Sequence, residues 1–125
     1  AAVRRTKTKA TQTVAETITA HTARERQVIE KALDDLKAQD IVVIDLDGKA
    51  SFADYMVIAT GTSSRHTASV ADNVAHALKK DGFRVYGIEG QQAGEWVCLD
   101  AGDIVVHIFQ EEFRRIYNLE KLWSV

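Results

Sequence analysis

Apolar residues along this chain form two helical stripes separated by runs of strand length. Between residues 22 and 39 they recur every three or four positions, on one side of a helix; these positions are Val28, Ile29, Ala32, Leu33 and Leu36. A second stripe follows the turn Gly61-Thr62-Ser63-Ser64 and predicts a helix that continues to about Lys80, before the stop signal Asp81-Gly82. Thr22 and one of the serines Ser63 and Ser64 are the candidate N-caps.

Three of the predicted strands lie before residue 90. Residues 41–46 and 55–60 are connected through Asp47-Gly48, which favours a tight turn, and we expect them to pair as an antiparallel hairpin. Residues 83–89 alternate between apolar and polar and predict a third strand. Because a helix separates this strand from residues 55–60, we expect the two to be parallel neighbours through a right-handed crossover.

Residues 96–99 and 104–109 predict a second hairpin around Asp100-Ala101-Gly102-Asp103, where Gly102 can supply the positive φ of a tight turn. The later strand is apolar on both faces except at His107. We therefore expect this strand near the middle of the sheet, with His107 as a core histidine.

The chain after this hairpin predicts a terminal helix, because Phe113, Ile116 and Tyr117 are spaced by three and four. We expect Leu122 to pack on the sheet, since its exposure would leave apolar area in water at ~25 cal/mol per Å². Trp123 is as well suited to a partner contact as to the core, because tryptophan is enriched at interfaces.

Together these elements predict an α/β fold with a mixed five-stranded sheet and flanking helices, in the order α-β-β-α-β-β-β-α. Residues 1–20 are rich in threonine and alanine and predict a flexible N-terminal tail. Residues 21–125 are predicted to form a single domain.

Charge is distributed unevenly between these two parts. The tail has four basic residues and one acidic residue, whereas residues 21–125 have 12 basic and 17 acidic residues, a formal charge of −5. An acidic domain is a poor binder of phosphates, so we expect no DNA partner and consider a basic protein instead. No apolar run is long enough for a membrane helix and the N-terminus lacks the apolar core of a secretory signal, so we expect a cytoplasmic protein without a membrane partner.

Catalytic and metal motifs are weak in this sequence. The four histidines form no His-x-x-x-His or Cys-His spacing, and the D-x-D pair Asp45 and Asp47 overlaps a turn where aspartate is favoured for local hydrogen bonds, so we predict no metal and no cofactor. Cys98 lies in an apolar strand and is interpreted as a small core residue rather than a nucleophile. The Gly61-Thr62-Ser63-Ser64 turn could hold an anion at a helix N-terminus, but it lacks a P-loop lysine.

The element order is also similar to that of nucleotidyltransferases, in which a glycine-serine turn opens a helix and a D-x-D pair on the next strand holds magnesium. Residues 83–89, FRVYGIE, lack that pair of carboxylates. This absence argues against such an enzyme. A nucleotide-binding enzyme that uses the Gly61-Thr62-Ser63-Ser64 turn remains the alternative function.

Three stretches together resemble the ribosomal silencing factor family, also called RsfS or Iojap-related. They are DDLKAQDIVVIDLDGKASFADYMVIATGTSSRH (residues 34–66), EWVCLDAGDIVVHIF (95–109) and RRIYNLEKLW (114–123). The resemblance covers about residues 25–125 and implies a non-enzymatic protein with a nucleotidyltransferase-like fold. It further implies binding to the large ribosomal subunit through ribosomal protein fourteen on the intersubunit face, a block of small-subunit joining, lower translation when nutrients are short, and frequent dimers.

The expected partner surface combines aromatic anchors with charged side chains near the second hairpin and the C-terminal segment. Its candidate residues are Trp96, Asp100, Glu111, Arg114, Tyr117, Glu120 and Trp123.

Overall fold

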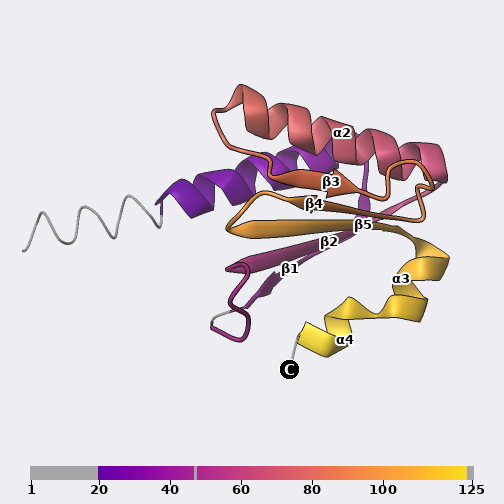
Figure 1. The fold of residues 1–125 in the computed structure, drawn as a ribbon. Coiled ribbons are helices and arrows are strands. Elements are labelled where there is room, and N and C mark those ends of the chain that lie inside the picture. Colours follow the sequence, from indigo (N-terminus) through magenta and orange to yellow (C-terminus); the bar gives the residue numbers. More distant parts are fainter. Residues whose placement is uncertain (1–19, 47, 124–125) are drawn as a thin grey trace, which may run out of the picture.

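The computed structural model of the protein describes residues 20–46 and 48–123. A helix over residues 20–35 is followed by two strands, a long helix, three strands and two short helices (Figure 1). Their bounds are β1 (Gln39–Asp45), β2 (Tyr55–Gly61), α2 (Ser64–Lys80), β3 (Gly87–Glu89), β4 (Trp96–Asp100), β5 (Ile104–Gln110), α3 (Glu111–Tyr117) and α4 (Leu119–Trp123). This order confirms the predicted α/β fold, except that the expected terminal helix consists of two short ones. Residues 1–19 of the proposed tail and Asp47 lie outside the described residues, and residue 20 begins the first helix.

The five strands form one mixed sheet in the order β1-β2-β5-β4-β3. β2 and β5 are parallel, with Tyr55 opposite Ile104 and Gly61 opposite Gln110. The other neighbours are antiparallel, so both predicted hairpins are confirmed. The central position of β5 is also confirmed, as expected for a strand that is apolar on both faces.

The expected placement of the third strand beside β2 is wrong. β3 is limited to three residues and pairs with β4 at the far edge of the sheet. Ile88 is partly buried while Gly87 and Glu89 are exposed, so β3 has too little apolar surface to compete with β5 for the central position.

Two helical layers of unequal size cover the sheet (Figure 1). The helix of residues 20–35 and α2 bury one face, in a core that includes Ile29, Leu33, Val70, Val74, Leu78, Val97, Leu99, Val106 and Ile108. α3 and α4 cover part of the other face, where a smaller cluster of Ile44, Leu46, Met56, Ile58 and Phe109 is packed against Phe113, Leu119 and Trp123. The second face therefore depends on very short elements for its cover.

Local signals fix the ends of α2. Ser63 is the N-cap, as one of the two predicted serines, and its Oγ accepts the His66 N–H at 3.0 Å. The helix ends before Gly82, which has a φ of +87°. Thr22 lies inside the first helix, so its prediction as an N-cap is wrong.

Gly90 occupies a position where the surrounding backbone leaves no room for a side chain. Its φ is +88°, and a Cβ there would overlap the carbonyl oxygen of Trp96 at the start of β4. Gly82 has nearly the same φ, but nothing lies within 4 Å of the place where its Cβ would be.

We predict that Gly82→Ala lowers the free energy of unfolding by about 1–2 kcal/mol from backbone strain alone, and Gly90→Ala by at least about 3 kcal/mol. Urea unfolding of both variants measures the difference, and equal losses would contradict a steric role for Gly90.

Candidate partner-binding surface

Trp96 begins β4 and lies on the sheet face that α3 and α4 cover. Val97 and Leu99 alternate to the other face and are fully buried. The Trp96 ring stacks on Phe109 with centroids 5.0 Å apart and contacts Tyr117 of α3 at 4.7 Å. The indole therefore joins the sheet to the C-terminal helices, while part of it stays accessible to solvent.

His107 fixes the position of the Trp96 indole through a hydrogen bond. Trp96 Nε1 donates a hydrogen bond to His107 Nδ1 at 2.9 Å. His107 is only 7% exposed, and this burial lowers its pKa from 6.5 to about 4. The imidazole is therefore neutral near pH 7 and available as an acceptor, which confirms the predicted core histidine.

Arg114 is buried and connects three elements. Its Nε donates to Glu120 Oε1 at 2.7 Å, and its Nη1 donates to Thr60 Oγ1 at 2.6 Å. The guanidinium thereby joins α3 to α4 and to the end of β2, and the residue is only 9% exposed. The sequence predicts Arg114 as a partner contact, which stays a prediction; in the structure its guanidinium supports the residues around it.

Asn118 separates α3 from α4. It has φ +44° and ψ +54°, and its N–H donates to the Arg114 carbonyl, a left-handed helix end that asparagine tolerates. The new helix direction turns Leu119 and Trp123 toward the sheet. Successive residues of a helix are rotated by about 100°, so Leu122 points away from the sheet when Trp123 faces it. Leu122 is 68% exposed, and its predicted packing on the sheet is therefore wrong.

Large apolar side chains remain exposed on these short helices. Ile116 is 66% exposed and Tyr117 is 51% exposed, in addition to Leu122. Their helical spacing suggested burial, but α3 has only seven residues and its inner side is taken by Phe113 and Arg114. We call Trp96, Ile116, Tyr117 and Leu122 the α3–α4 surface. Sequence reasoning had not selected Ile116 or Leu122 as candidate contacts.

The remaining predicted residues lie in different places. Glu111 and Glu120 line an open hollow of about 440 Å³, together with Asp40, Val42, Arg114, Arg115 and Asn118. Trp123 meets Phe52 of the β1–β2 connection edge to face, with centroids 5.5 Å apart. Asp100 is at the opposite end of β4 from Trp96, roughly 13 Å away at about 3.3 Å per residue. There its carboxylate accepts the Gly102 N–H at 2.8 Å and shapes the β4–β5 turn.

The Gly61-Thr62-Ser63-Ser64 turn has internal partners for much of its polar surface. The Thr62 N–H donates to His66 Nδ1 at 2.9 Å, so the imidazole proton is on Nε2, which donates to the Leu36 carbonyl at 2.6 Å. The Ser63 hydroxyl is used as the N-cap and the Ser64 hydroxyl accepts from Gln110 at 3.0 Å. An anion at this turn would have to compete with these contacts.

Cys98 lies on the same strand face as Trp96 and is partly buried. Its burial, with Asp100 and Glu89 nearby, raises the pKa of the thiol. A raised pKa disfavours the thiolate, which supports the interpretation of Cys98 as an inert residue. Among the described helices, none has the length and apolar character needed to cross a membrane.

Comparisons with known proteins agree with this fold. The family model described as "Ribosomal silencing factor during starvation" matches residues 19–125. The ribosomal silencing factor RsfS of Haemophilus influenzae is 45% identical over 98 residues, which are 78% of this chain and 96% of that protein. The mouse protein "Mitochondrial assembly of ribosomal large subunit protein 1" is 37% identical over 91 residues, 70% of this chain and 40% of its own length. A crystal structure of a Chromobacterium violaceum protein has a TM-score of 0.79 and 38% identity and covers 81% of this chain and 84% of its own.

Fold and sequence thus define an α/β protein with a mixed five-stranded sheet and an exposed aromatic surface beside its C-terminal helices. The chain belongs to the ribosomal silencing factor family.

Arg114 offers a first test of how this surface is supported. Arg114→Ala leaves the Thr60 hydroxyl and the Glu120 carboxylate without their partner, and we predict a loss of about 2–3 kcal/mol in the free energy of unfolding. Arg115→Ala is the matched control, because this side chain is 74% exposed and its ion pair with Glu111 is 4.0 Å long. The control should change stability by less than about 0.5 kcal/mol. Similar urea midpoints for the two variants would contradict the assigned role of Arg114.

His107 should make stability depend on pH. The unfolded chain binds a proton at His107 below its ordinary pKa of 6.5, whereas the folded chain binds it only below about 4. Acidification through this window therefore favours unfolding. Relative to His107→Gln, which does not titrate and can still accept from Trp96, the native protein should lose on the order of 3 kcal/mol between pH 6.5 and pH 4. Parallel stability curves for the two proteins would contradict this assignment.

Proposed function

We propose that this protein binds the large ribosomal subunit through ribosomal protein fourteen on the intersubunit face. Bound there, it blocks association with the small subunit and represses translation when nutrients are limiting. The observation that carries the proposal is the α3–α4 surface, an exposed group of large apolar side chains in a member of the ribosomal silencing factor family. The name of the mouse relative, which refers to assembly of the large subunit, supports the same partner.

The α3–α4 surface has the properties of an interface anchor. Ile116, Tyr117 and Leu122 are each more than half exposed, and burial of such side chains contributes roughly 25 cal/mol per Å² of apolar area. Trp96 contacts Tyr117 and is held by His107, so these aromatic groups are already ordered before a partner arrives. Ordered anchors lose little side-chain entropy on binding, which favours affinity.

Charge supports a basic protein partner. Residues 21–125 have a formal charge of −5, and Glu111 and Glu120 line the hollow beside α3. Carboxylates at the rim of an interface mainly increase the association rate and exclude acidic competitors. We assign this role to Glu111, with Asp100 contributing from the β4–β5 turn. Trp123 extends the apolar contact toward Phe52. Glu120 and Arg114 position the short helices.

The proposed role is non-enzymatic and cytoplasmic, and the family resemblance also supports a homodimer, which sedimentation velocity would detect. The alternative is a nucleotide-binding enzyme at the Gly61-Thr62-Ser63-Ser64 turn. That alternative requires a nucleotide with magnesium to raise the melting temperature through preferential binding to the folded state. The internal hydrogen bonds of the turn favour the ribosomal role.

A subunit-joining assay on sucrose gradients tests the proposal. Purified large subunits are incubated with excess protein before small subunits are added. We predict that the protein migrates with free large subunits and reduces the peak of joined ribosomes. The double substitution Tyr117→Ala and Leu122→Ala should weaken binding by at least about tenfold, since each removes an exposed anchor worth about 1 kcal/mol or more.

Tyr86→Ala is the matched control for this assay. Tyr86 is 59% exposed, like Tyr117, but lies before β3 at the other edge of the sheet. The control variant should block subunit joining as the native protein does, and circular dichroism should be unchanged for both variants. If the native protein leaves subunit joining unaffected, the proposed function fails. If the double variant blocks joining as well as the native protein, the α3–α4 surface is not the contact.

A further inference from the structure

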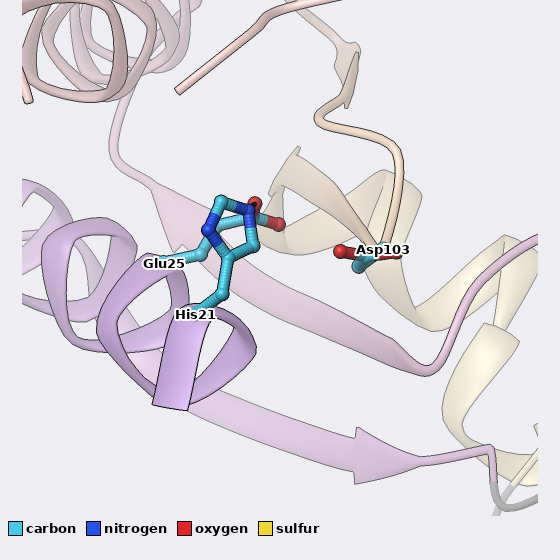
Figure 2. A group of neighbouring side chains, drawn as sticks. All are labelled: His21, Glu25 and Asp103. Carbon is cyan, nitrogen blue, oxygen red and sulfur yellow. Dashed lines mark ion pairs between the residues drawn. The ribbon is translucent and has the colours of Figure 1, made fainter. Parts of the chain in front are cut away.

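Three potential metal ligands come together on the opposite side of the sheet from α3 and α4. His21 and Glu25 lie one turn apart on the first helix, and Asp103 lies in the turn between β4 and β5 (Figure 2). One ligand atom from each residue lies within 4.8 Å of those from the other two. His21 Nε2 and Glu25 Oε2 are 3.8 Å apart, too far for a hydrogen bond.

Glu25 is buried without adequate compensation. Its side chain is only 3% exposed, and its Oε1 has no hydrogen-bond partner in the part of the chain that the structure describes. Burial, followed by the nearby Asp103 and Asp54 carboxylates, raises its pKa to about 7. A buried carboxyl group with an unused oxygen and further carboxylates around it is a costly arrangement, unless a cation is present.

The two arginines that flank Glu25 in the sequence are engaged elsewhere. Arg24 forms a bidentate ion pair with Asp81, in which Nε lies 2.6 Å from Oδ2 and Nη2 lies 2.7 Å from Oδ1. Arg26 pairs with Glu30 at 3.1 Å and lies over the ring of Tyr55. The group around Glu25 therefore has an excess of negative charge that neither neighbouring arginine neutralises.

We propose that His21, Glu25 and Asp103 bind one divalent cation of the first transition row, such as Zn²⁺. One imidazole nitrogen and two carboxylate oxygens are the mixed ligand set that such ions accept, whereas Mg²⁺ prefers oxygen ligands and retains several waters. Three protein ligands leave a fourth position for water. The ion's charge would compensate the carboxylates, and its coordination would use the free Glu25 oxygen.

The exposure of two of the three ligands suits this assignment. Tetrahedral coordination at about 2.0–2.1 Å places ligand atoms about 3.3 Å apart, so the three side chains must approach by roughly an ångström. His21, with a side chain 55% exposed, and Asp103, which is also exposed, have room to rotate toward the fixed Glu25. The Asp103 backbone is anchored, because its carbonyl accepts the Asp54 and Tyr55 N–H groups at 2.8 and 3.2 Å.

A cation at this position would connect the first helix to the β4–β5 turn. These two segments are far apart in sequence. The His21 ring also tilts against Phe83, which follows α2, with ring centroids 4.9 Å apart. Occupancy would stabilise the docking of the helix on the sheet. The site is independent of the α3–α4 surface, so its test does not depend on the proposed ribosomal function.

Isothermal titration of the full chain with Zn²⁺ near neutral pH, together with thermal unfolding, tests this proposal. We expect one equivalent of Zn²⁺ to bind and the melting temperature to rise with Zn²⁺ concentration, as linkage requires for a ligand of the folded state. Glu25→Gln and His21→Ala should each weaken the binding by at least about 100-fold, beyond the loss usual for residues that only support a ligand. Glu25→Gln replaces a buried titratable carboxyl group with a neutral amide, so this variant should fold at least as well as the native protein without metal.

His76→Ala is the control variant, since His76 is an exposed histidine on α2 outside the cluster. This variant should bind Zn²⁺ like the native protein. The proposal is overturned if the native protein binds no Zn²⁺, or if Glu25→Gln and His21→Ala bind it with unchanged affinity. Equal stabilisation by Mg²⁺ would overturn the assigned class of cation.

Discussion

The burial of β5 on both of its faces is the constraint on which the rest of this structure depends. Ile104, Val106 and Ile108 face the layer of long helices, and Phe109 and His107 are buried on the other face. A strand of this kind needs a neighbour at each edge and a cover on each side. β2 and β4 provide the neighbours, and the chain after β5 must turn back over the second face as α3 and α4.

The second face is covered by helices of only seven and five residues, and this limited cover explains its chemistry. Such helices bury few apolar groups, so polar contacts of Arg114 with Thr60 and Glu120 help to hold them in place. The same shortness leaves Ile116 and Leu122 outside. A surface that is both ordered and apolar therefore results from how the central strand is covered.

Hydrophobic periodicity predicted the elements well because burial on one side imposes a repeat of 3.6 or 2 on the sequence. A run that is apolar on both faces indicated the central position of β5, and the residue types at the Gly61-Thr62-Ser63-Ser64 turn indicated Ser63 as a candidate cap. Hydrophobic patterning has limits. It could not place β3, whose position depends on competition among strands, nor the burial of Arg114, which requires Thr60, 54 residues away. The spacing of His21 and Glu25 is visible in the sequence, but Asp103 joins them only through the fold. The prediction of no metal site considered the histidine and cysteine spacings and the Asp45-x-Asp47 pair, and none of these brings Asp103 to the first helix.

His107 and Glu25, whose pKa values are shifted far from their ordinary values, influence stability in opposite directions. His107 has its pKa lowered from 6.5 to about 4, so its contribution is lost as the pH falls through this range. Glu25 has its pKa raised from 4.5 to about 7, so its contribution is complete below pH 4.5 and is lost as the pH rises toward 7. Where the ranges overlap, the unfolded chain holds its extra proton on His107 and the folded chain holds one on Glu25. The folded and unfolded chains therefore bind nearly the same number of protons in this range. The free energy of unfolding of the native protein would then change little with pH, although both groups have shifted pKa values. A bound cation would favour the ionised form of Glu25 and would thereby remove the contribution of Glu25 to this pH dependence.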